Sequence, residues 1–182
     1  MRTYISKLIE SNNLIIKDAV MDECDQLQYI CSTWTDKLLL EGEEFEENYV
    51  LKCLTDGDLP PVENASKEKY CLKSIYLKES NTIIGFIDIY HGYPNLQTLW
   101  ISIFVLDRNI QNKGFGQEVI EALTKDVIDT NYNKIGIAVQ LKNWKALRFW
   151  TKAGFSKVIG IYGDKDFGQD TYALIGLEKD IR

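Results

Sequence analysis

The stretch RNIQNKGFG, residues 108–116, stands between the apolar run LWISIFVLD (99–107) and the segment QEVIEALTKDVID (117–129). Phe115, Val119, Leu123 and Val127 recur every four residues, which predicts an amphipathic helix from about residue 115 to about residue 129. A strand, a glycine-containing turn and a helix in this order bring unpaired backbone amides and the positive end of the helix dipole to one spot. Anions bind readily at such a spot, so the stretch is a candidate phosphate loop.

Three kinds of phosphate loop compete for this stretch. The NTPase pattern G-x-x-x-x-G-K-[ST] is absent, because Lys113 precedes Gly114, and the dinucleotide pattern G-x-G-x-x-G fails at Val119. Gly114 and Gly116 remain, where a side chain would hold a phosphate away from the backbone or force a strained backbone angle. The alternative is a loop that only turns a strand into a helix, since short glycine motifs often match by chance.

The rest of the chain predicts one α/β domain over residues 1–182. Strands are expected at 14–17, 71–78, 83–90, 99–106 and 135–140, and a closing hairpin at 155–162 and 170–177. Helices are expected from Asp22, within 34–54, and from Asn143 to Gly154. In the last of these, Asn143 caps the start of the helix and Gly154 ends it. The strand–helix–strand unit of 99–140 implies two parallel strands. The predicted fold is a mixed central β-sheet with helices on both faces.

Composition excludes several classes of partner. The 182 residues carry a net charge of −6, which disfavours nucleic acid as a partner. No apolar run approaches the ~18 residues of a membrane span and the N-terminus lacks a signal-peptide core, which predicts a cytoplasmic protein with no membrane partner. Cys24, Cys31, Cys53 and Cys71 have no C-x-x-C spacing and no histidine cluster, so we expect free thiols and no metal.

Two motifs together resemble a known family. Gln111, Gly114 and Gly116 form Q-x-x-G-x-G, and NWKALRFWTKAGF (143–155) follows at the expected distance. They resemble the acyl-CoA pyrophosphate loop and the N-x-x-A-x-x-F-Y-x-K-x-G-F helix of the GNAT superfamily of N-acetyltransferases. The helix matches at Asn143, Ala146, Phe149, Lys152, Gly154 and Phe155. The resemblance spans residues 99–157 and implies a GNAT-like acyl-CoA N-acyltransferase fold.

The resemblance also implies a reaction and a coenzyme site. Acetyl-CoA would be the co-substrate, and an acetyl group would pass to a primary amine of a small molecule or peptide by direct attack in a ternary complex, without a metal. Main-chain groups of one splayed strand would pair with the pantetheine arm, loop amides would hold the pyrophosphate, and the later helix would contribute side chains. The residues that match these roles are Phe104, Val105, Leu106, Gln111, Asn112, Lys113, Gly114, Phe115, Gly116, Gln117, Asn143 and Trp150.

The sequence departs from the family at two positions of catalytic interest. Trp150 replaces the helix tyrosine that often acts as general acid, and Trp100 stands where some relatives carry a glutamate base. A non-catalytic acyl-CoA-binding module is therefore a second hypothesis. Neither departure is decisive, because CoA leaves as a thiolate with a pKa near ~8.5, judging from cysteine.

Replacements for the missing acid and base can be named. Asp88 and Tyr90 share one face of a predicted strand, and His91, the sole histidine, stands at its end. His91 has a pKa suited to accepting an amine proton, although a lone histidine more often satisfies a loop carbonyl. Tyr162 and Tyr172 on the closing hairpin are weaker candidates for the acid.

The acidic run EGEEFEE (41–47) bears on the acceptor. Such a run is usually a solvated helix face; the alternative is that it attracts a cationic acceptor. The acceptor's identity and the acyl-chain length do not follow from the sequence. A homodimer is an expectation from the family alone.

Overall fold

The computed structural model describes residues 2–181 of the chain. Eight strands form one sheet in the order β1-β2-β3-β4-β5-β6-β8-β7. Among the strands of residues 2–181, β5 and β6 pair in parallel, and every other neighbouring pair is antiparallel. The strands are β1 (Leu8–Glu10), β2 (Leu14–Asp18), β3 (Tyr70–Leu77), β4 (Thr82–His91), β5 (Thr98–Leu106), β6 (Lys134–Gln140), β7 (Lys157–Gly163) and β8 (Ala173–Asp180).

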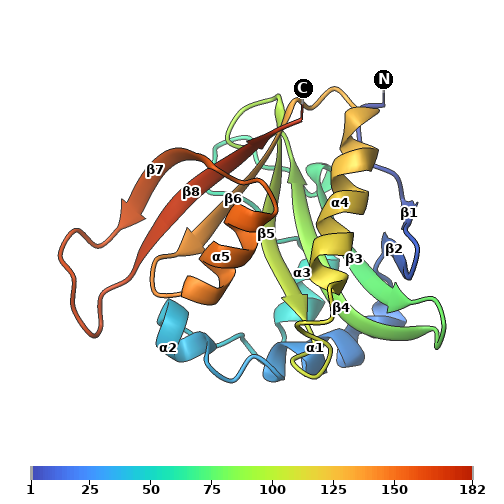
Figure 1. Ribbon diagram of the computed structural model, residues 1–182, viewed down its shortest axis with the longest axis horizontal. Helices are drawn as coiled ribbons and strands as arrows, with labels where there is room; N and C mark the ends of the chain where they lie inside the picture. The colour runs from blue at the N-terminus through green and yellow to red at the C-terminus, as the bar shows by residue number, and fades with distance from the viewer. Residues whose placement is uncertain (1, 182) are drawn as a thin grey trace.

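Helices cover both faces of this sheet. In Figure 1, α4 and α5 lie in front of the strands, whereas α1 and α3 lie behind them. The α-helices are α1 (Cys24–Ser32), α2 (Lys37–Glu41), α3 (Tyr49–Thr55), α4 (Phe115–Ile128) and α5 (Trp144–Lys152), and 3-10 turns occur at Met21–Glu23 and Lys67–Lys69. The predicted α/β fold, a mixed sheet between helices, is confirmed.

Each face has its own apolar core. In front, Val119, Leu123 and Val127 of α4 are buried against the sheet, as their four-residue spacing predicts. Behind, Leu27 and Ile30 of α1 and Val50 of α3 pack on β3, β4 and β5. The sheet is thus packed against apolar side chains on both faces.

Some elements differ from the sequence-based expectation. Region 34–54 forms two short helices, α2 and α3, and the acidic run 41–47 is not a helix face, because α2 ends at Glu41 and Gly42 takes a left-handed backbone angle of φ 83°. β1 was not predicted, since three residues with one buried side chain are too few for a visible alternation.

The parallel strands β5 and β6 separate halfway along their length. Their pairing runs from Thr98 opposite Lys134 to Ile101 opposite Ile137, while β6 continues beside β8 as far as Gln140. β5 continues beside β4 to Leu106, after a bulge that leaves Ser102 without an opposite residue. The sheet therefore opens at Ser102. No helix within residues 2–181 is both long and apolar enough for a membrane crossing.

Candidate active site

A cleft of about 500 Å³ occupies the opening between β5 and β6. Its walls come from the second half of β5, the loop before α4, the first turn of α4, α5 and the segment between α1 and α2. Of the predicted coenzyme-site residues, the cleft brings together Phe104, Val105, Leu106, Gln111, Asn112, Gly114, Gly116, Gln117, Asn143 and Trp150. Lys113 and Phe115 are not among its lining residues.

The loop before α4 leaves donors free at the mouth of this cleft. Gly114 is the N-cap with φ 89°, and the backbone hydrogen bond from Glu118 N–H to the Gly114 carbonyl, 3.1 Å long, begins the helix ladder. The amides before Glu118 thus have no intrahelical acceptor. Gln111 fastens the loop to the strand, because its Nε2 donates to the Leu106 carbonyl at 2.9 Å, and Lys145 bonds to Gln111 Oε1. An anion would meet a pre-formed set of donors here.

The two glycines of the loop serve different purposes. A Cβ at Gly114 would meet no heavy atom within 4 Å, so the requirement there is the left-handed backbone and the open space above it. A Cβ at Gly116 would lie 3.2 Å from Phe149 Cε2. Close packing of α4 on α5 is thus a further reason for glycine at position 116, and the obstruction of a phosphate by a side chain there stays a prediction.

Two residues of the α5 motif shape the opposite wall. Asn143 is buried and caps the helix, since its Oδ1 accepts a hydrogen bond from the Ala146 amide at 3.0 Å. Its amide nitrogen can still donate a hydrogen bond to a ligand. Trp150 packs edge to face between Phe149 and Phe155, with ring centroids 4.9 Å away in each case. Its indole fills the wall without offering an acid.

Asp88 lies on β4 behind the cleft, on the face covered by α1 and α3. Its side chain is fully buried, and its Oδ2 accepts hydrogen bonds from the hydroxyls of Tyr70 at 3.0 Å and Tyr49 at 3.3 Å. Oδ1 accepts no hydrogen bond of ordinary geometry from the described residues. Burial raises the pKa of the Asp88 carboxyl well above its ordinary value and Asp58 adds to this, while Tyr70, Ser102 and Tyr49 lower it in part. A buried ionisable group thus lies next to Ser102.

Tyr90 shares the face of Asp88, as predicted, but its hydroxyl has a structural partner. The side chain is 1% exposed, and its oxygen accepts a hydrogen bond from the Ser66 amide at 3.0 Å. Tyr90 therefore fastens the loop before β3 and does not line the cleft.

His91 faces the opposite side of the sheet. Its Nδ1 lies 3.1 Å from the Tyr132 hydroxyl, its Nε2 lies 4.0 Å from Cys71 Sγ, and the Tyr4 ring packs against it. Burial, with a smaller effect of Lys73, lowers the pKa of His91 to about 4. The imidazole is neutral near pH 7 and is not part of the cleft lining. Its partner is a tyrosine hydroxyl, so the expected loop carbonyl is wrong.

Other candidates also have structural surroundings. Tyr172 packs against the Lys142 ammonium, 3.9 Å from its ring centroid, and Tyr162 is 53% exposed on β7. The four cysteines are free thiols, as expected. Within residues 2–181, no three His, Cys, Asp or Glu side chains gather into a metal-binding group.

Sequence reasoning missed the partners of Asp88. Tyr49 begins α3, Tyr70 begins β3, and Ser102 forms the bulge of β5, three elements distant in the sequence. The available signal was the single carboxylate within the apolar strand IIGFIDIY, because a buried acid needs hydrogen-bond donors around it.

The mixed sheet opens between its parallel strands, and a glycine turn at the start of a helix faces this opening. This arrangement defines the class of acyltransferase folds that the motifs at 111–116 and 143–155 resemble. The family model of the acetyltransferase (GNAT) family matches residues 33–155. The chain belongs to this family, whose members use acetyl-CoA and are generally N-acetyltransferases.

Solved structures share the fold at low sequence identity. A GNAT-family acetyltransferase from Bacillus anthracis has a TM-score of 0.71 and 19% identity, covering 96% of this chain and 98% of its own. RimL, a ribosomal L7/L12 alpha-N-protein acetyltransferase in complex with coenzyme A, has a TM-score of 0.72 and 13% identity, covering 95% and 97%. A chimera of spermidine N-acetyltransferase SpeG from Vibrio cholerae and hSSAT has a TM-score of 0.69 and 15% identity, covering 93% and 96%. No curated protein matches the sequence.

Proposed function

We propose that this protein is an N-acetyltransferase that uses acetyl-CoA as co-substrate and transfers the acetyl group to a primary amine of a small molecule or peptide. The observation that carries the proposal is the cleft between β5 and β6, which ends at the unpaired amides of the α4 N-terminus. A narrow arm and an anionic end are the two parts of an acyl-CoA that this shape fits. Family membership supports the same reaction.

The chain's own groups can hold such a co-substrate. Main-chain groups of Phe104, Val105 and Leu106 lie on the side of β5 that β6 has left, so an arm could pair there as an added strand. The loop amides and the Gly114 turn would hold the pyrophosphate. A free amide of β5 near the Ser102 bulge would stabilise negative charge that develops on a thioester oxygen.

Asp88 is the proton acceptor that the geometry favours. A base that receives a proton from an attacking ammonium works best when its pKa lies near the working pH, and burial shifts Asp88 in that direction. Burial shifts His91 away from neutrality, and Tyr90 is tied to Ser66. The Tyr49 hydroxyl and Ser102 would connect Asp88 to the opening of the sheet.

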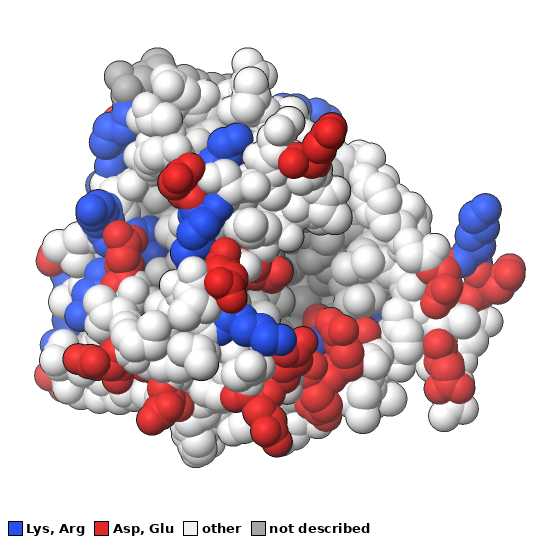
Figure 2. All heavy atoms as spheres, turned by 180° about the vertical axis from the view of Figure 1, so that it is seen from behind, with Lys and Arg blue, Asp and Glu red and all other residues white. Residues whose placement is uncertain are grey.

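The acceptor side of the molecule is acidic. Figure 2 shows the back of the protein, where the surface is hollowed near its centre and acidic side chains lie along the lower edge of the hollow. Burial raises the pKa values of Glu41 and Asp58, and repulsion from Glu43 adds to both shifts, while the Lys37 ammonium opposes the shift at Glu41. Carboxylates gathered in this way favour a cationic acceptor.

A non-catalytic acyl-CoA-binding module is the competing function, and buried Trp150 is the observation that favours it, because indole cannot protonate a departing thiolate. Calorimetric titration with acetyl-CoA followed by thiol release across a panel of amines separates the two. Saturable one-to-one binding with thiol release supports the transferase. Tight binding without release for every amine supports the module, and absence of binding refutes both.

A further inference from the structure

Asp88, the proton acceptor of the proposed function, is closed off from the spaces that an acceptor can enter. Its side chain is fully buried, and it lines neither the coenzyme cleft nor a second cavity of about 580 Å³ on the face of the sheet that α1 covers. An acceptor ammonium in either space therefore needs a hydrogen-bonded group between itself and the carboxylate. This requirement rests on the proposed function, and it makes the hydroxyl groups around Asp88 the candidates.

Two tyrosine hydroxyls donate to the same oxygen of Asp88, but their surroundings differ. Tyr70 begins β3, is 7% exposed, and its hydroxyl lies 3.0 Å from Asp88 Oδ2. Tyr49 begins α3, is only half-buried, and its hydroxyl lies 3.3 Å from the same oxygen. The Tyr49 ring packs on Phe45, with ring centroids 4.8 Å apart, and Phe45 lines the second cavity. Tyr49 thus lies between the buried carboxylate and a cavity wall, while Tyr70 belongs to the core.

The wall beside Tyr49 is shared by the two cavities. Phe45 packs edge to face on Trp34, with ring centroids 5.9 Å apart. Trp34 lines both the second cavity and the coenzyme cleft. Three aromatic rings in contact therefore lead from the coenzyme cleft to the hydroxyl that bonds to Asp88.

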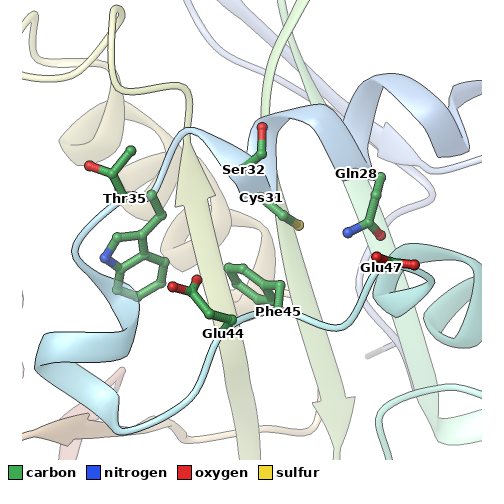
Figure 3. A pocket seen from close by; sticks show the side chains of 8 residues that line it. Gln28, Cys31, Ser32, Thr35, Glu44, Phe45 and Glu47 are labelled. Carbon is green, nitrogen blue, oxygen red and sulfur yellow. The ribbon is translucent and has the colours of Figure 1, made fainter.

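A side chain of α1 fixes the position of Tyr49. Gln28 Nε2 donates to the Glu46 carbonyl at 3.0 Å, and Gln28 Oε1 accepts a hydrogen bond from the Val50 amide at 3.0 Å. The two bonds hold the chain on either side of Tyr49. Figure 3 shows Gln28 on α1 beside the segment that carries Glu47. The chain at Tyr49 is thus held against α1, as a group that passes a proton over hydrogen-bond distance requires.

The ionisable groups that interact with Asp88 come from α3, the chain that follows it and β3. They are Tyr49, Cys53, Asp58, Lys67, Tyr70 and Cys71. Burial and then the Asp88 charge raise the pKa of Tyr49, so its phenol stays protonated near pH 7 and passes a proton only by exchange. Asp58, in the loop after α3, adds to the raised pKa values of Asp88 and Tyr49 by repulsion. A second carboxylate is therefore close enough to both groups to attract an ammonium toward them.

We propose that Tyr49 is a further catalytic residue, a relay that passes the proton of the acceptor ammonium to Asp88, and that Tyr70 is a positioning residue that holds the same carboxylate oxygen. In the relay step an ammonium N–H bond breaks and its proton binds the Tyr49 oxygen, while the Tyr49 O–H bond breaks and its proton binds Asp88 Oδ2. One positive and one negative charge are neutralised, and the free amine can attack the thioester. The reverse exchange with water after product release restores the carboxylate.

The test compares two variants that each remove one hydroxyl from the same oxygen. Tyr49→Phe and Tyr70→Phe both remove a hydrogen bond to the ionised carboxylate, so both should move the acid limb of the pH profile of kcat to higher pH, by about one unit. Only Tyr49→Phe should also lower the kcat plateau, by roughly tenfold or more, because it interrupts the relay. Tyr70→Phe should keep the plateau within about threefold, since Asp88 and the relay remain.

Tyr90→Phe is the matched control, because the Tyr90 hydroxyl bonds to Ser66 on the same face of the sheet and not to Asp88. We expect it to change neither the plateau nor the acid limb. Ser102→Ala tests the other hydroxyl beside Asp88. Thermal unfolding and acetyl-CoA titration of all four variants show that each folds and binds the co-substrate.

The outcomes separate the relay from the proposed function. No thiol release by the wild type with any amine refutes the function and the relay with it. Wild-type turnover together with equal plateaus for Tyr49→Phe and Tyr70→Phe refutes the relay alone. A large loss of turnover in Ser102→Ala with none in Tyr49→Phe assigns the relay to Ser102 and contradicts the role of Tyr49.

Discussion

Asp88 and His91 stand three residues apart on β4 and face opposite sides of the sheet, and burial acts on them with opposite consequences for chemistry. Burial disfavours charge at both positions, which raises the pKa of Asp88 and lowers that of His91 to about 4. The pKa of the carboxyl is thereby shifted upward in the direction of neutral pH, and the pKa of the imidazole is shifted downward away from it. The imidazole of His91, which would titrate near neutrality in water, is here neutral at pH 7.

The two sites also differ in what they leave unsatisfied. Both nitrogens of His91 have neighbours, Tyr132 and Cys71, and its surroundings belong to the front core. Asp88 keeps one oxygen without a hydrogen-bond donor of ordinary geometry in the described part of the chain. An unpaired buried acceptor costs free energy of folding, which makes Asp88 the candidate to test for chemistry. The comparison therefore favours Asp88 over His91 as the proposed base, and the variants below test that choice.

The strongest test of the comparison is Asp88→Asn. The amide has the same shape and cannot accept a proton, so we expect kcat for amine acetylation to fall by roughly a hundredfold or more. In the wild type, activity should rise with pH as Asp88 ionises, and this dependence should be absent in the variant. Steady-state rates across pH, measured by thiol release, check both.

The control for Asp88→Asn is the affinity for acetyl-CoA, because Asp88 is not among the residues that line the coenzyme cleft. Calorimetry should give the same dissociation constant for Asp88→Asn and the wild type, and thermal unfolding should show that the variant folds. Undiminished turnover in the folded variant would remove Asp88 from the mechanism.

The second test concerns the stability of His91→Asn across pH. The folded-state pKa of His91 lies below its ordinary value of 6.5, so the neutral imidazole stabilises the fold above pH 6.5, and this contribution is lost as pH falls toward 4. The loss amounts to about 3 kcal/mol at most. Urea unfolding at several pH values should therefore give a flatter profile for the variant. Acetylation at pH 7.5 should change little, and a large loss of turnover in a stable variant would restore His91 as a base.

The sequence was sufficient to predict the coenzyme cleft on the front of the molecule, but not the hydrogen-bond partners of Asp88 at the back. Residues 99–157 form local strand–turn–helix units whose glycine, cap and period are each visible in the chain, so the cleft and ten of its residues could be predicted. The Asp88 cluster depends on Tyr49 and Tyr70, brought together by α3 and β3 across the sheet. Neither residue has a spacing relation to Asp88. Periodicity gives the face on which a side chain lies but not which donors from other elements will face it.

A third test moves to the cleft and compares Gly114→Ala with Gly116→Ala. At Gly114 the left-handed backbone of φ 89° would cost an alanine roughly 1–2 kcal/mol, and its methyl group would enter the open space above the loop. We expect acetyl-CoA affinity to fall about tenfold or more, with the pH dependence of turnover unchanged.

Gly116→Ala should act differently, because its backbone angle suits alanine and its new methyl group meets Phe149 on α5. We expect a smaller loss of affinity and a measurable loss of thermal stability, since overpacking displaces neighbouring side chains. Equal effects of the two substitutions on acetyl-CoA binding would contradict the separate purposes assigned to the two glycines.

The smallest expected effect separates the two functions of Asn143. Asn143→Ala removes the cap on α5 and should cost about 1 kcal/mol of folding free energy. Asn143→Asp keeps the oxygen that accepts from Ala146 and loses the amide donors, so stability should be retained while acetyl-CoA affinity falls if those donors hold the coenzyme. Thermal unfolding and calorimetry of both variants give the two quantities independently. If Asn143→Asp binds acetyl-CoA as tightly as the wild type, Asn143 resembles His91, a buried polar residue whose value is structural, and the coenzyme is held by the loop amides alone.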